Sequence, residues 1–450
     1  MIDKDDPKRP EMIQEVLRTI KSNQINYVRL HFSDIHGMLK SFAVRAKDLE
    51  NYFDDGAYFD GSSITGYGNV EESDMVAVPD PSTFKILPWR DEKNLVSRII
   101  CDVYKPDMTR FEGDPRYILQ KTVKKANSMG YDFYCAPEME FFLLEPDLAN
   151  VAKPSDMRGY FDFDPQDKNE MMRRAMSEFC LKMGIDIEAL HHEVATGQHE
   201  IDIRYDECVN MADKSITLKM VVKIVAALNG MVGTFMPKPF FGANGSGMHV
   251  HQSLWKDGEN AFYDADDPMN ISTVMKKYIA GQLKYGREIT AVLASWPNSY
   301  KRLVPGYEAP VYLAWDYKNR SAMVRVPNFG GKPSGARCEI RCPDPSGNPY
   351  LQFAVLLAAG LKGIEEDLPP AEPTSANIFD MDAVEMKKRG IDSLPGSLGE
   401  ALSYFEESAL MKETFGERPF KNYLYAKLEE WDAYRMVVHP WELERYVDKL

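Results

Sequence analysis

The sequence has few cysteines, and none of them form a CxxC pair. The 450 residues include six cysteines that are scattered along the chain. This distribution argues against a disulfide framework or a zinc knuckle as the basis of the fold. Cys338 and Cys342 are four residues apart and could form a metal pair, but ordinary buried thiols are the favoured interpretation.

A long apolar run is also missing. The chain begins MIDKDDPKRP, a charged stretch without an apolar segment of secretory length, so neither a signal peptide nor a membrane anchor is indicated. The longest apolar helix candidate, residues 351–361, is interrupted by Gly360 and is too short to span a bilayer. We therefore expect a cytoplasmic protein without a membrane partner.

Dense runs of lysine and arginine are absent as well. The formal net charge is -15, and nucleic-acid binding depends on basic patches, so a nucleic-acid partner is disfavoured. The 44% hydrophobic and 27% charged residues are typical of soluble globular proteins, and the length is sufficient for two or three cores. No internal repeat or low-complexity segment is present.

The first part of the chain predicts a small mixed domain. Apolar residues at helical spacing predict a helix that ends near Ser22. Two strand-like runs, YVRLHF from Tyr27 and LKSFAV from Leu39, flank a segment with the composition of a hairpin turn at residues 34–37. We assign residues 1–105 to this domain.

A larger domain is predicted over residues 106–450. The polar segment that follows residue 105 leads to Asp114-Pro115, a pair typical of a helix start, and the helix is expected to stop at Gly130. Strand-like runs then alternate with long helices, which indicates an α/β or α+β architecture. The longest of these helices are predicted over residues 171–183 and 216–228.

Four strand-like segments carry charged or imidazole side chains two residues apart. This spacing places both side chains on one face of a strand. The sets are Glu138 with Glu140, Glu200 with Asp202 and Arg204, His249 with His251, and Glu339 with Arg341. A half-exposed strand with its charged face in water is the simpler explanation of any one set. Four sets together predict a sheet or barrel wall lined with ligands.

The chemistry of these side chains favours a divalent metal. Hard cations such as Mg²⁺ or Mn²⁺ prefer carboxylate oxygens and accept imidazole. HHEVATGQHE adds Glu193, which a turn brings toward Glu200, although a polar loop with two incidental acids is the alternative. Six candidate ligands result, enough for two metal ions with positions open for water or phosphate. They are Glu138, Glu140, Glu193, Glu200, His249 and Glu339.

Arginines concentrate near the last of these strands. Arg302, Arg320, Arg325, Arg337 and Arg341 lie within a stretch of forty residues. Guanidinium groups hold carboxylate and phosphate through paired hydrogen bonds, which phosphoryl transfer requires. A solvated basic surface is the alternative, but the surrounding sequence is rich in Val, Leu, Pro and Gly.

A glycine-rich loop, KPFFGANGSGMHVH, begins at Lys238. It has no GxxxxGK[ST] pattern and leads into a strand, so neither a P-loop nor a Rossmann turn fits. Backbone amides of such a loop could still approach a substrate carboxylate or amine closely, because glycine has no Cβ.

These segments together resemble type I glutamine synthetase. The segments that carry the resemblance are PEMEFFL, HHEVATGQHE, KPFFGANGSGMHVH, KRLVPGYEAPVYLAW, NRSAMVRVP and RCEIRCPDPSGNPY, with FDGSSITGY and EESDM in the first domain. The resemblance implies an α+β fold with a small β-grasp-like amino-terminal domain. It also implies a large catalytic domain whose antiparallel sheet forms a split barrel completed between subunits, flanked by helices.

The resemblance also implies metal ligands and substrate contacts. Glu140, Glu193 and Glu200 correspond to the ligands of one metal, and Glu138, His249 and Glu339 to those of a second that bridges the ATP phosphates. Arg302 matches the clamp on the glutamate carboxylate, with Asn244 and Gly245 beside the substrate amine. Arg341 resembles an anchor at the reacting end, and Arg320 with Arg325 resembles the pair that stabilises the transferring phosphoryl group.

Nucleotide contacts are implied for Glu188, Tyr205, His251, Ser253, Lys332 and Arg337. The loop over residues 326–337 is one residue longer than the best-known bacterial pattern. The implied reaction forms γ-glutamyl phosphate from L-glutamate and ATP, and ammonia then displaces phosphate to give glutamine, a step of nitrogen assimilation. Asp60 resembles the residue that a neighbouring subunit supplies to deprotonate ammonium, with Ser63 and Tyr160 lining the pocket and Glu308 closing it.

The resemblance implies a homo-oligomer, a dodecamer of two hexameric rings. The final segment, WELERYVDKL, is expected either to tie the rings together or to be ordinary core. A PII-type protein and 2-oxoglutarate are family-level candidates for regulators. Phe379, within Asn377–Asp380, has no hydroxyl where the adenylylated subtype has tyrosine, so control of that kind is not expected. The glutamine-inhibited bacterial branch has an arginine where this chain has Asn69, which disfavours strong feedback inhibition by glutamine.

Three competing functions differ in their products. A γ-glutamyl-amine or polyamine synthetase shares the fold but accepts a larger amine, and the presence of Asp60 and Glu308 favours ammonia. A catalytically silent relative is disfavoured because each metal and phosphate position holds a competent residue. A metal-dependent hydrolase would release phosphate without an added amine.

Overall fold

The computed structural model describes residues 6–67, 73–90, 93–146, 153–164, 166–307, 309–317, 321–374, 378, 381 and 383–450. Six positions singled out in the sequence lie outside the described residues. They are Asn69, Glu308, Arg320, Asn377, Phe379 and Asp380.

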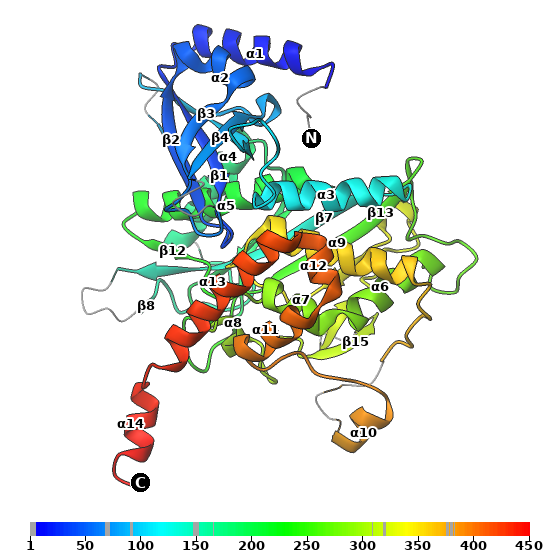
Figure 1. Cartoon of the computed structure of the whole chain (residues 1–450). Helices are drawn as coiled ribbons and strands as arrows, with labels where there is room; N and C mark the ends of the chain where they lie inside the picture. Colours follow the sequence, from blue (N-terminus) through cyan, green and yellow to red (C-terminus); the bar gives the residue numbers. More distant parts are fainter. Residues whose placement is uncertain are drawn as a thin grey trace.

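A six-stranded sheet forms the amino-terminal part, drawn in blue at the top of Figure 1. Its strands run in the order β2-β1-β6-β4-β3, and β5 pairs with β6. The strands are β1 (Tyr27–Ser33), β2 (Leu39–Arg45), β3 (Ala57–Asp60), β4 (Asp74–Pro79), β5 (Lys85–Ile86) and β6 (Val96–Tyr104). The predicted hairpin is confirmed, because β1 and β2 pair antiparallel from Tyr27 with Arg45 to Ser33 with Leu39.

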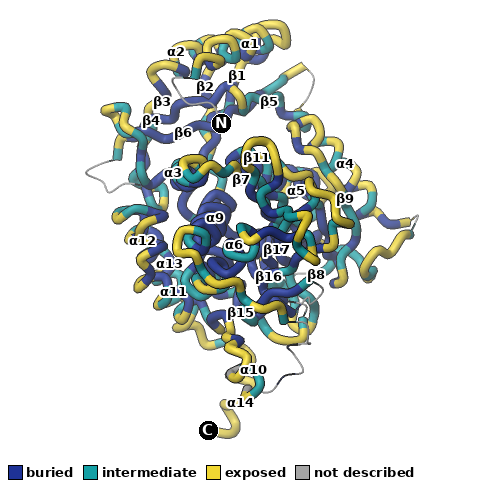
Figure 2. The backbone as a smooth tube through the Cα atoms, turned by 90° about the vertical axis from the view of Figure 1, so that its right-hand side faces the viewer, coloured by how far each residue is buried: buried dark blue, intermediate teal, exposed yellow. Residues whose placement is uncertain are grey.

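Helices α1 (Arg9–Ser22) and α2 (Leu49–Asp55) accompany this sheet. α1 ends at the predicted residue, and its buried Val16 and Ile20 join a core with Val28 and Phe53. Apolar side chains at helical spacing face the sheet and leave the outer surface of the helix in water. The exposed outer surface of both helices is visible in Figure 2.

The predicted helix start at Asp114 is confirmed. Asp114 accepts a hydrogen bond from the Arg116 backbone N–H and precedes α3 (Pro115–Ser128). Such a cap satisfies a backbone donor that has no partner within the helix. Gly130 has a φ of +84°, a left-handed conformation that ends the helix at low steric cost.

An eleven-stranded sheet organises the larger part of the chain. Its order is β15-β16-β17-β13-β7-β10-β9, with β8, β11 and β12 paired to β7 and β14 paired to β13. The strands are β7 (Asp132–Glu145), β8 (Lys153–Pro154), β9 (Ile187–His192), β10 (Gln198–Ile203), β11 (Asp206–Glu207), β12 (Val232–Thr234), β13 (Met248–Lys256), β14 (Glu259–Asn260), β15 (Tyr312–Asp316), β16 (Ala322–Arg325) and β17 (Cys338–Ile340). All described pairings in it are antiparallel except β15 with β16.

Helices lie between and after these strands along the chain. They are α4 (Lys168–Lys182), α5 (Cys208–Leu228), α6 (Thr273–Lys284), α7 (Gly286–Leu293), α8 (Ser299–Arg302), α9 (Pro349–Glu365), α10 (Ala383–Lys388), α11 (Leu398–Glu407), α12 (Ala409–Phe415), α13 (Glu417–Arg435) and α14 (Pro440–Tyr446). α5 begins at Cys208, so the prediction of a helix from Ile216 was wrong at that end. The earlier start buries Val209 and Ala212.

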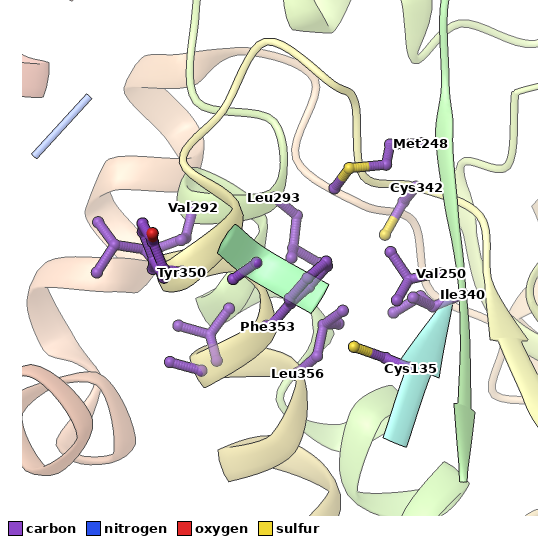
Figure 3. Packing of buried hydrophobic residues seen from close by; sticks show 14 of the residues in the cluster. Cys135, Met248, Val250, Val292, Leu293, Ile340, Cys342, Tyr350, Phe353 and Leu356 are labelled. Carbon is purple, nitrogen blue, oxygen red and sulfur yellow. The ribbon is translucent and has the colours of Figure 1, made fainter. Parts of the chain in front are cut away.

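The helix α9 lies at the centre of the larger core (Figure 2). Figure 3 shows its Phe353 and Leu356 near side chains of the sheet such as Val250. α9 and α6 approach closely because both carry glycine at the crossing. A Cβ on Gly281 would lie 2.2 Å from the Ala359 carbonyl oxygen.

The carboxyl-terminal helix α14 projects away from the body, drawn in red in Figure 1. Its Trp441 and Leu443 are exposed, so the expectation that this segment is ordinary core is wrong for the single chain. All six cysteines are buried free thiols, as predicted. Within the described part of the chain, no helix has the length and apolar composition to cross a membrane.

Candidate active site

Strand register brings the predicted polar pairs together across neighbouring strands. Glu140 of β7 pairs with Glu200 of β10, and Glu138 pairs with Asp202 on one side and His249 of β13 on the other. β13 in turn places His251 opposite Glu339 of β17. Paired residues in a sheet point to the same face, so four strands present their acids and imidazoles on one surface.

A cleft of about 390 Å³ lies over this surface. Most of the predicted metal ligands and substrate arginines line it. Those that do are Glu138, Glu140, Glu193, Glu200, His249, Arg302, Arg325, Arg341, Asn244, Gly245 and Tyr160. Glu339 lies directly beneath the lining, since both Arg325 and Arg341 donate to its carboxylate at 2.5 Å.

A second cavity of about 470 Å³ adjoins the cleft, and Glu138, Ala189 and Asp202 line both. Predicted nucleotide contacts line this second cavity. They are Glu188, Tyr205, His251, Ser253 and Arg337. Tyr134 and Trp255 also line it, with ring centroids 5.7 Å apart. Sequence analysis did not identify these two aromatic residues, although Trp255 follows His251 and Ser253 at the same two-residue spacing.

Besides Glu339, three of the described predicted site residues line neither cavity. Lys332 is exposed and does not line the second cavity. Asp60 is exposed at the end of β3, where its carboxylate accepts from the Ser62 backbone N–H at 2.8 Å. Neither Asp60 nor Ser63 lines the acidic cleft. Arg204, predicted within a strand, lies one residue beyond β10.

Burial and mutual repulsion raise the pKa of two of these acids. Burial, followed by the charge of Asp202, raises the pKa of Glu200 to about 10. The pKa of Glu140 is also raised by burial and by repulsion from Glu200 and Glu193. A cation among these groups would remove the repulsion, so their environment fits a bound metal.

Glu138 behaves differently because two imidazole groups hydrogen-bond to its carboxylate. Burial opposes ionisation of Glu138, but hydrogen bonds from His249 and His251 lower its pKa. The His249 Nδ1 and His251 Nε2 atoms lie 2.8 Å and 2.7 Å from its two oxygens. Burial, followed by the charge of Arg341, lowers the pKa of His249 to about 4. A neutral imidazole is the form that binds a metal.

In two places, ligand atoms of three acids or histidines lie close enough together to coordinate one cation. Ligand atoms of Glu138, His251 and Glu339 lie within 4.8 Å of one another, and so do those of His191, Glu200 and Asp202. His191 was missed by sequence analysis, although it directly precedes the His192-Glu193 pair. Its Nε2 lies 3.1 Å from Glu200 Oε1.

Backbone carbonyls fix the Arg302 guanidinium at the edge of the cleft. The Arg302 guanidinium donates to the backbone carbonyls of Arg341, Cys342 and Pro343 at 2.9 to 3.0 Å. A Cβ on Gly247 would lie 2.4 Å from Arg302 Nη2, so this glycine permits the loop to pass over the guanidinium. The glycine-rich loop therefore lies against Arg302, an approach that the missing Cβ of glycine permits.

The fold and the cleft define a class of enzyme in which one sheet surface holds divalent cations and anionic substrates together. Models of the glutamine synthetase β-grasp domain and of the glutamine synthetase catalytic domain match residues 24–106 and 112–446, respectively. The chain belongs to the glutamine synthetase family. The predicted α+β fold, with a β-grasp domain before the catalytic domain, is thereby confirmed.

Relatives with known names support the same membership. Glutamine synthetase of Methanosarcina mazei is 49% identical over 439 residues, which cover 97% of this chain and 98% of the relative. Glutamine synthetase of Clostridium saccharobutylicum is 50% identical over 438 residues, with the same two coverages. Among solved structures, Plasmodium falciparum glutamine synthetase aligns with a TM-score of 0.87 at 26% identity, covering 96% of this chain and 98% of that one. A GmaS/ADP complex aligns with a TM-score of 0.86 at 28% identity, covering 96% and 99%.

Proposed function

We propose that the protein ligates ammonia to the side-chain carboxylate of L-glutamate, with ATP as phosphoryl donor and γ-glutamyl phosphate as intermediate. The observation that carries the proposal is the junction of the two cavities at Glu138. A nucleotide in the aromatic-lined cavity would direct its phosphates into the acidic cleft, where glutamate and the arginines meet.

Six side chains are the proposed metal ligands. Glu140, Glu193 and Glu200 would hold one divalent cation, and Glu138, His249 and Glu339 would hold a second. When bound, Mg²⁺ or Mn²⁺ supplies positive charge that neutralises phosphate and carboxylate oxygens during transfer. The raised pKa values of Glu140 and Glu200 support a cation at the first set.

The arginines have separate proposed tasks. Arg302 holds the glutamate α-carboxylate, with Asn244 and Gly245 beside the substrate amine. Arg341 and Arg325, both paired with buried Glu339, stabilise charge that develops at the reacting end. The proposed roles of Arg320 and Glu308 rest on the family resemblance alone.

The nucleotide contacts are proposed on the second cavity. Glu188, Tyr205, His251, Ser253 and Arg337 line it and can contact the base, ribose or phosphates of ATP. The adjoining rings of Tyr134 and Trp255 offer an apolar surface for the adenine. Lys332 is proposed to close over the phosphates from its exposed position.

We further propose that a neighbouring subunit completes the ammonium pocket. Asp60 and Ser63 do not line the cleft of their own chain, whereas Tyr160 does. A dodecamer of two hexameric rings would supply them in trans, and exposed apolar residues on α14 are available for contacts between rings. The boundary between the two domains is proposed at residues 105–106, directly after β6. PII-type proteins and 2-oxoglutarate are the regulators to test first.

The test is phosphate release from ATP and Mg²⁺ with glutamate, with and without ammonium, alongside direct detection of glutamine. Ammonium-dependent glutamine formation that collapses in Asp60→Ala supports the proposal. Asp55→Ala, which removes an exposed carboxylate from the end of α2, is the matched control and is expected to retain activity. Phosphate release without amine would indicate a hydrolase, and product formation only with polyamines would indicate a γ-glutamyl-amine synthetase.

A further inference from the structure

A buried carboxylate outside the cleft holds the turn between two of the proposed metal ligands. The Asp156 side chain is 3% exposed. Its Oδ1 accepts hydrogen bonds from His192 Nε2 and from the Gly197 backbone N–H, both at 2.9 Å. Its Oδ2 accepts from the Asn169 side-chain amide, which fixes the carboxylate from the opposite side.

Two of the three groups that donate to Asp156 Oδ1 lie at the two ends of that turn, and the third is the Arg158 backbone N–H. His192 directly precedes the ligand Glu193, and Gly197 lies three residues before the ligand Glu200. The Gly197 carbonyl also accepts from the Leu143 backbone N–H at 2.9 Å. The Asp156 carboxylate therefore connects both ends of the turn to the segment that follows β8, a strand that pairs with β7.

Leu143 of β7 and Pro154 of β8 limit the space around the turn. Gly197 has a φ of +70°, and a Cβ there would lie 3.0 Å from both the Leu143 carbonyl oxygen and Pro154 Cβ. Gly197 therefore packs closely against Leu143 and Pro154, with no room for a side chain. Loss of the Asp156 hydrogen bonds would release the His192 side chain and the Gly197 backbone N–H, and only the Gly197 carbonyl would stay bonded to β7.

The contact extends to the proposed ammonium pocket. The His192 carbonyl accepts from the Phe161 backbone N–H at 3.1 Å, and the Phe161 ring stacks on Tyr160 with centroids 4.1 Å apart. His192 thus joins the Asp156 carboxylate to the loop that carries Tyr160.

A metal at Asp156 itself is the competing explanation. Ligand atoms of Asp156, His192 and His199 lie within 4.8 Å of one another, and His199 Nε2 has no hydrogen-bond partner. However, Arg173 Nη1 lies 3.0 Å from His199 Nδ1, so it donates to that atom and leaves the proton on Nε2. A protonated Nε2 cannot bind a cation, and the guanidinium repels one.

We propose that Asp156 is a positioning residue, which holds His192 and Gly197 so that the Glu193 and Glu200 carboxylates converge on one cation. The inference rests on the proposed function and deepens it. Hydrogen-bonded groups that orient metal ligands typically change metal affinity by about 10- to 100-fold when removed. The same range is expected for Asp156.

The experiment is Mn²⁺ binding to the full-length protein without substrates, measured from the electron paramagnetic resonance signal of free Mn²⁺. Asp156→Ala removes both carboxylate oxygens, and with them the acceptors for His192, Gly197 and Asn169. We expect its Mn²⁺ dissociation constant to rise about 10-fold or more. Asp164→Ala is the matched control, since Asp164 lies on the same loop and pairs with Arg158 at the surface. It should stay within about twofold of wild type.

Wild-type Mn²⁺ affinity in folded Asp156→Ala would overturn the proposal. Glu200→Gln separates this failure from a failure of the proposed function: if it also leaves Mn²⁺ binding unchanged, the metal assignment falls and the role of Asp156 falls with it. If Asp156→Ala does not fold, His192→Phe, which keeps a ring but has no Nε2 donor, tests the same link from the other side. Its weakened Mn²⁺ binding would support the proposal, and wild-type binding would overturn it.

Discussion

Arg116 joins the two parts of the chain, and its replacement should destabilise both. Its guanidinium lies within 2.7 to 2.9 Å of carboxylate oxygens of Asp80, Asp102 and Asp213. The first two belong to the amino-terminal sheet region, and Asp213 lies on α5. The Arg116 side chain is 3% exposed, so the network is shielded from water.

The expected loss follows from leaving these carboxylates unpaired. Removal of one partner from a buried ion pair costs about 3–5 kcal/mol, because the remaining charge stays desolvated. Arg116→Met keeps much of the side-chain volume and should therefore reduce the free energy of unfolding by about 3–5 kcal/mol. Arg116→Lys retains the charge but not the planar fork and should lose less.

Urea unfolding followed by circular dichroism measures this loss. Arg45→Met is the control, because Arg45 pairs with Asp48 at the surface and such pairs contribute less than about 1 kcal/mol. An Arg116→Met protein within about 1 kcal/mol of wild type would refute the reasoning. That result would mean that the three carboxylates become hydrated or protonated at little cost in free energy when Arg116 is replaced.

The same network predicts a dependence on pH. Burial raises the pKa of Asp102, but Arg116 and Arg110 outweigh it, and the pKa is lowered. Stability from a lowered carboxylate pKa is present above the unfolded value and is lost as the pH falls through the folded one. Wild type should therefore lose stability below about pH 4, and Arg116→Met should lose less of it on acidification.

Three further predictions concern the site and the core. Without metal, stability should fall as the pH rises above about 4.5 toward 10, because Glu200, with its pKa raised to about 10, holds a proton that the unfolded chain releases; thermal melts of Glu200→Gln across this range should show a weaker dependence. Arg302→Lys keeps the charge without the fork, so we expect KM for glutamate to rise about 10-fold, with a smaller change in KM for ATP, in steady-state assays. Gly281→Ala should lower the free energy of unfolding by about 1–3 kcal/mol in urea titrations, because its Cβ would meet the Ala359 carbonyl. The first prediction is contradicted if wild type and Glu200→Gln show the same dependence of stability on pH. The second is contradicted if the KM values for glutamate and ATP rise equally, and the third if the urea midpoint of Gly281→Ala is unchanged.

Much of the local structure could be predicted from neighbouring residues. The hairpin around residues 34–37, the helix start at Asp114 and the end of α1 depend on turn chemistry, capping and periodicity, which act over a few residues. The two-residue spacing of Glu138 with Glu140 and of His249 with His251 likewise determined which side chains share a face of a strand. Sequence motifs were sufficient to indicate the family.

Tertiary structure decided which of these faces meet. The pairing of Glu140 with Glu200 depends on the register of β7 and β10, and a shift of one residue would turn every side chain to the other face. The contacts of Asp156 with His192 and of Arg116 with Asp213 link residues that are 36 and 97 positions apart. Spacing along the chain sets the direction of a side chain. Its distant partners follow from how the sheets and helices bury their apolar faces, which only the folded chain specifies.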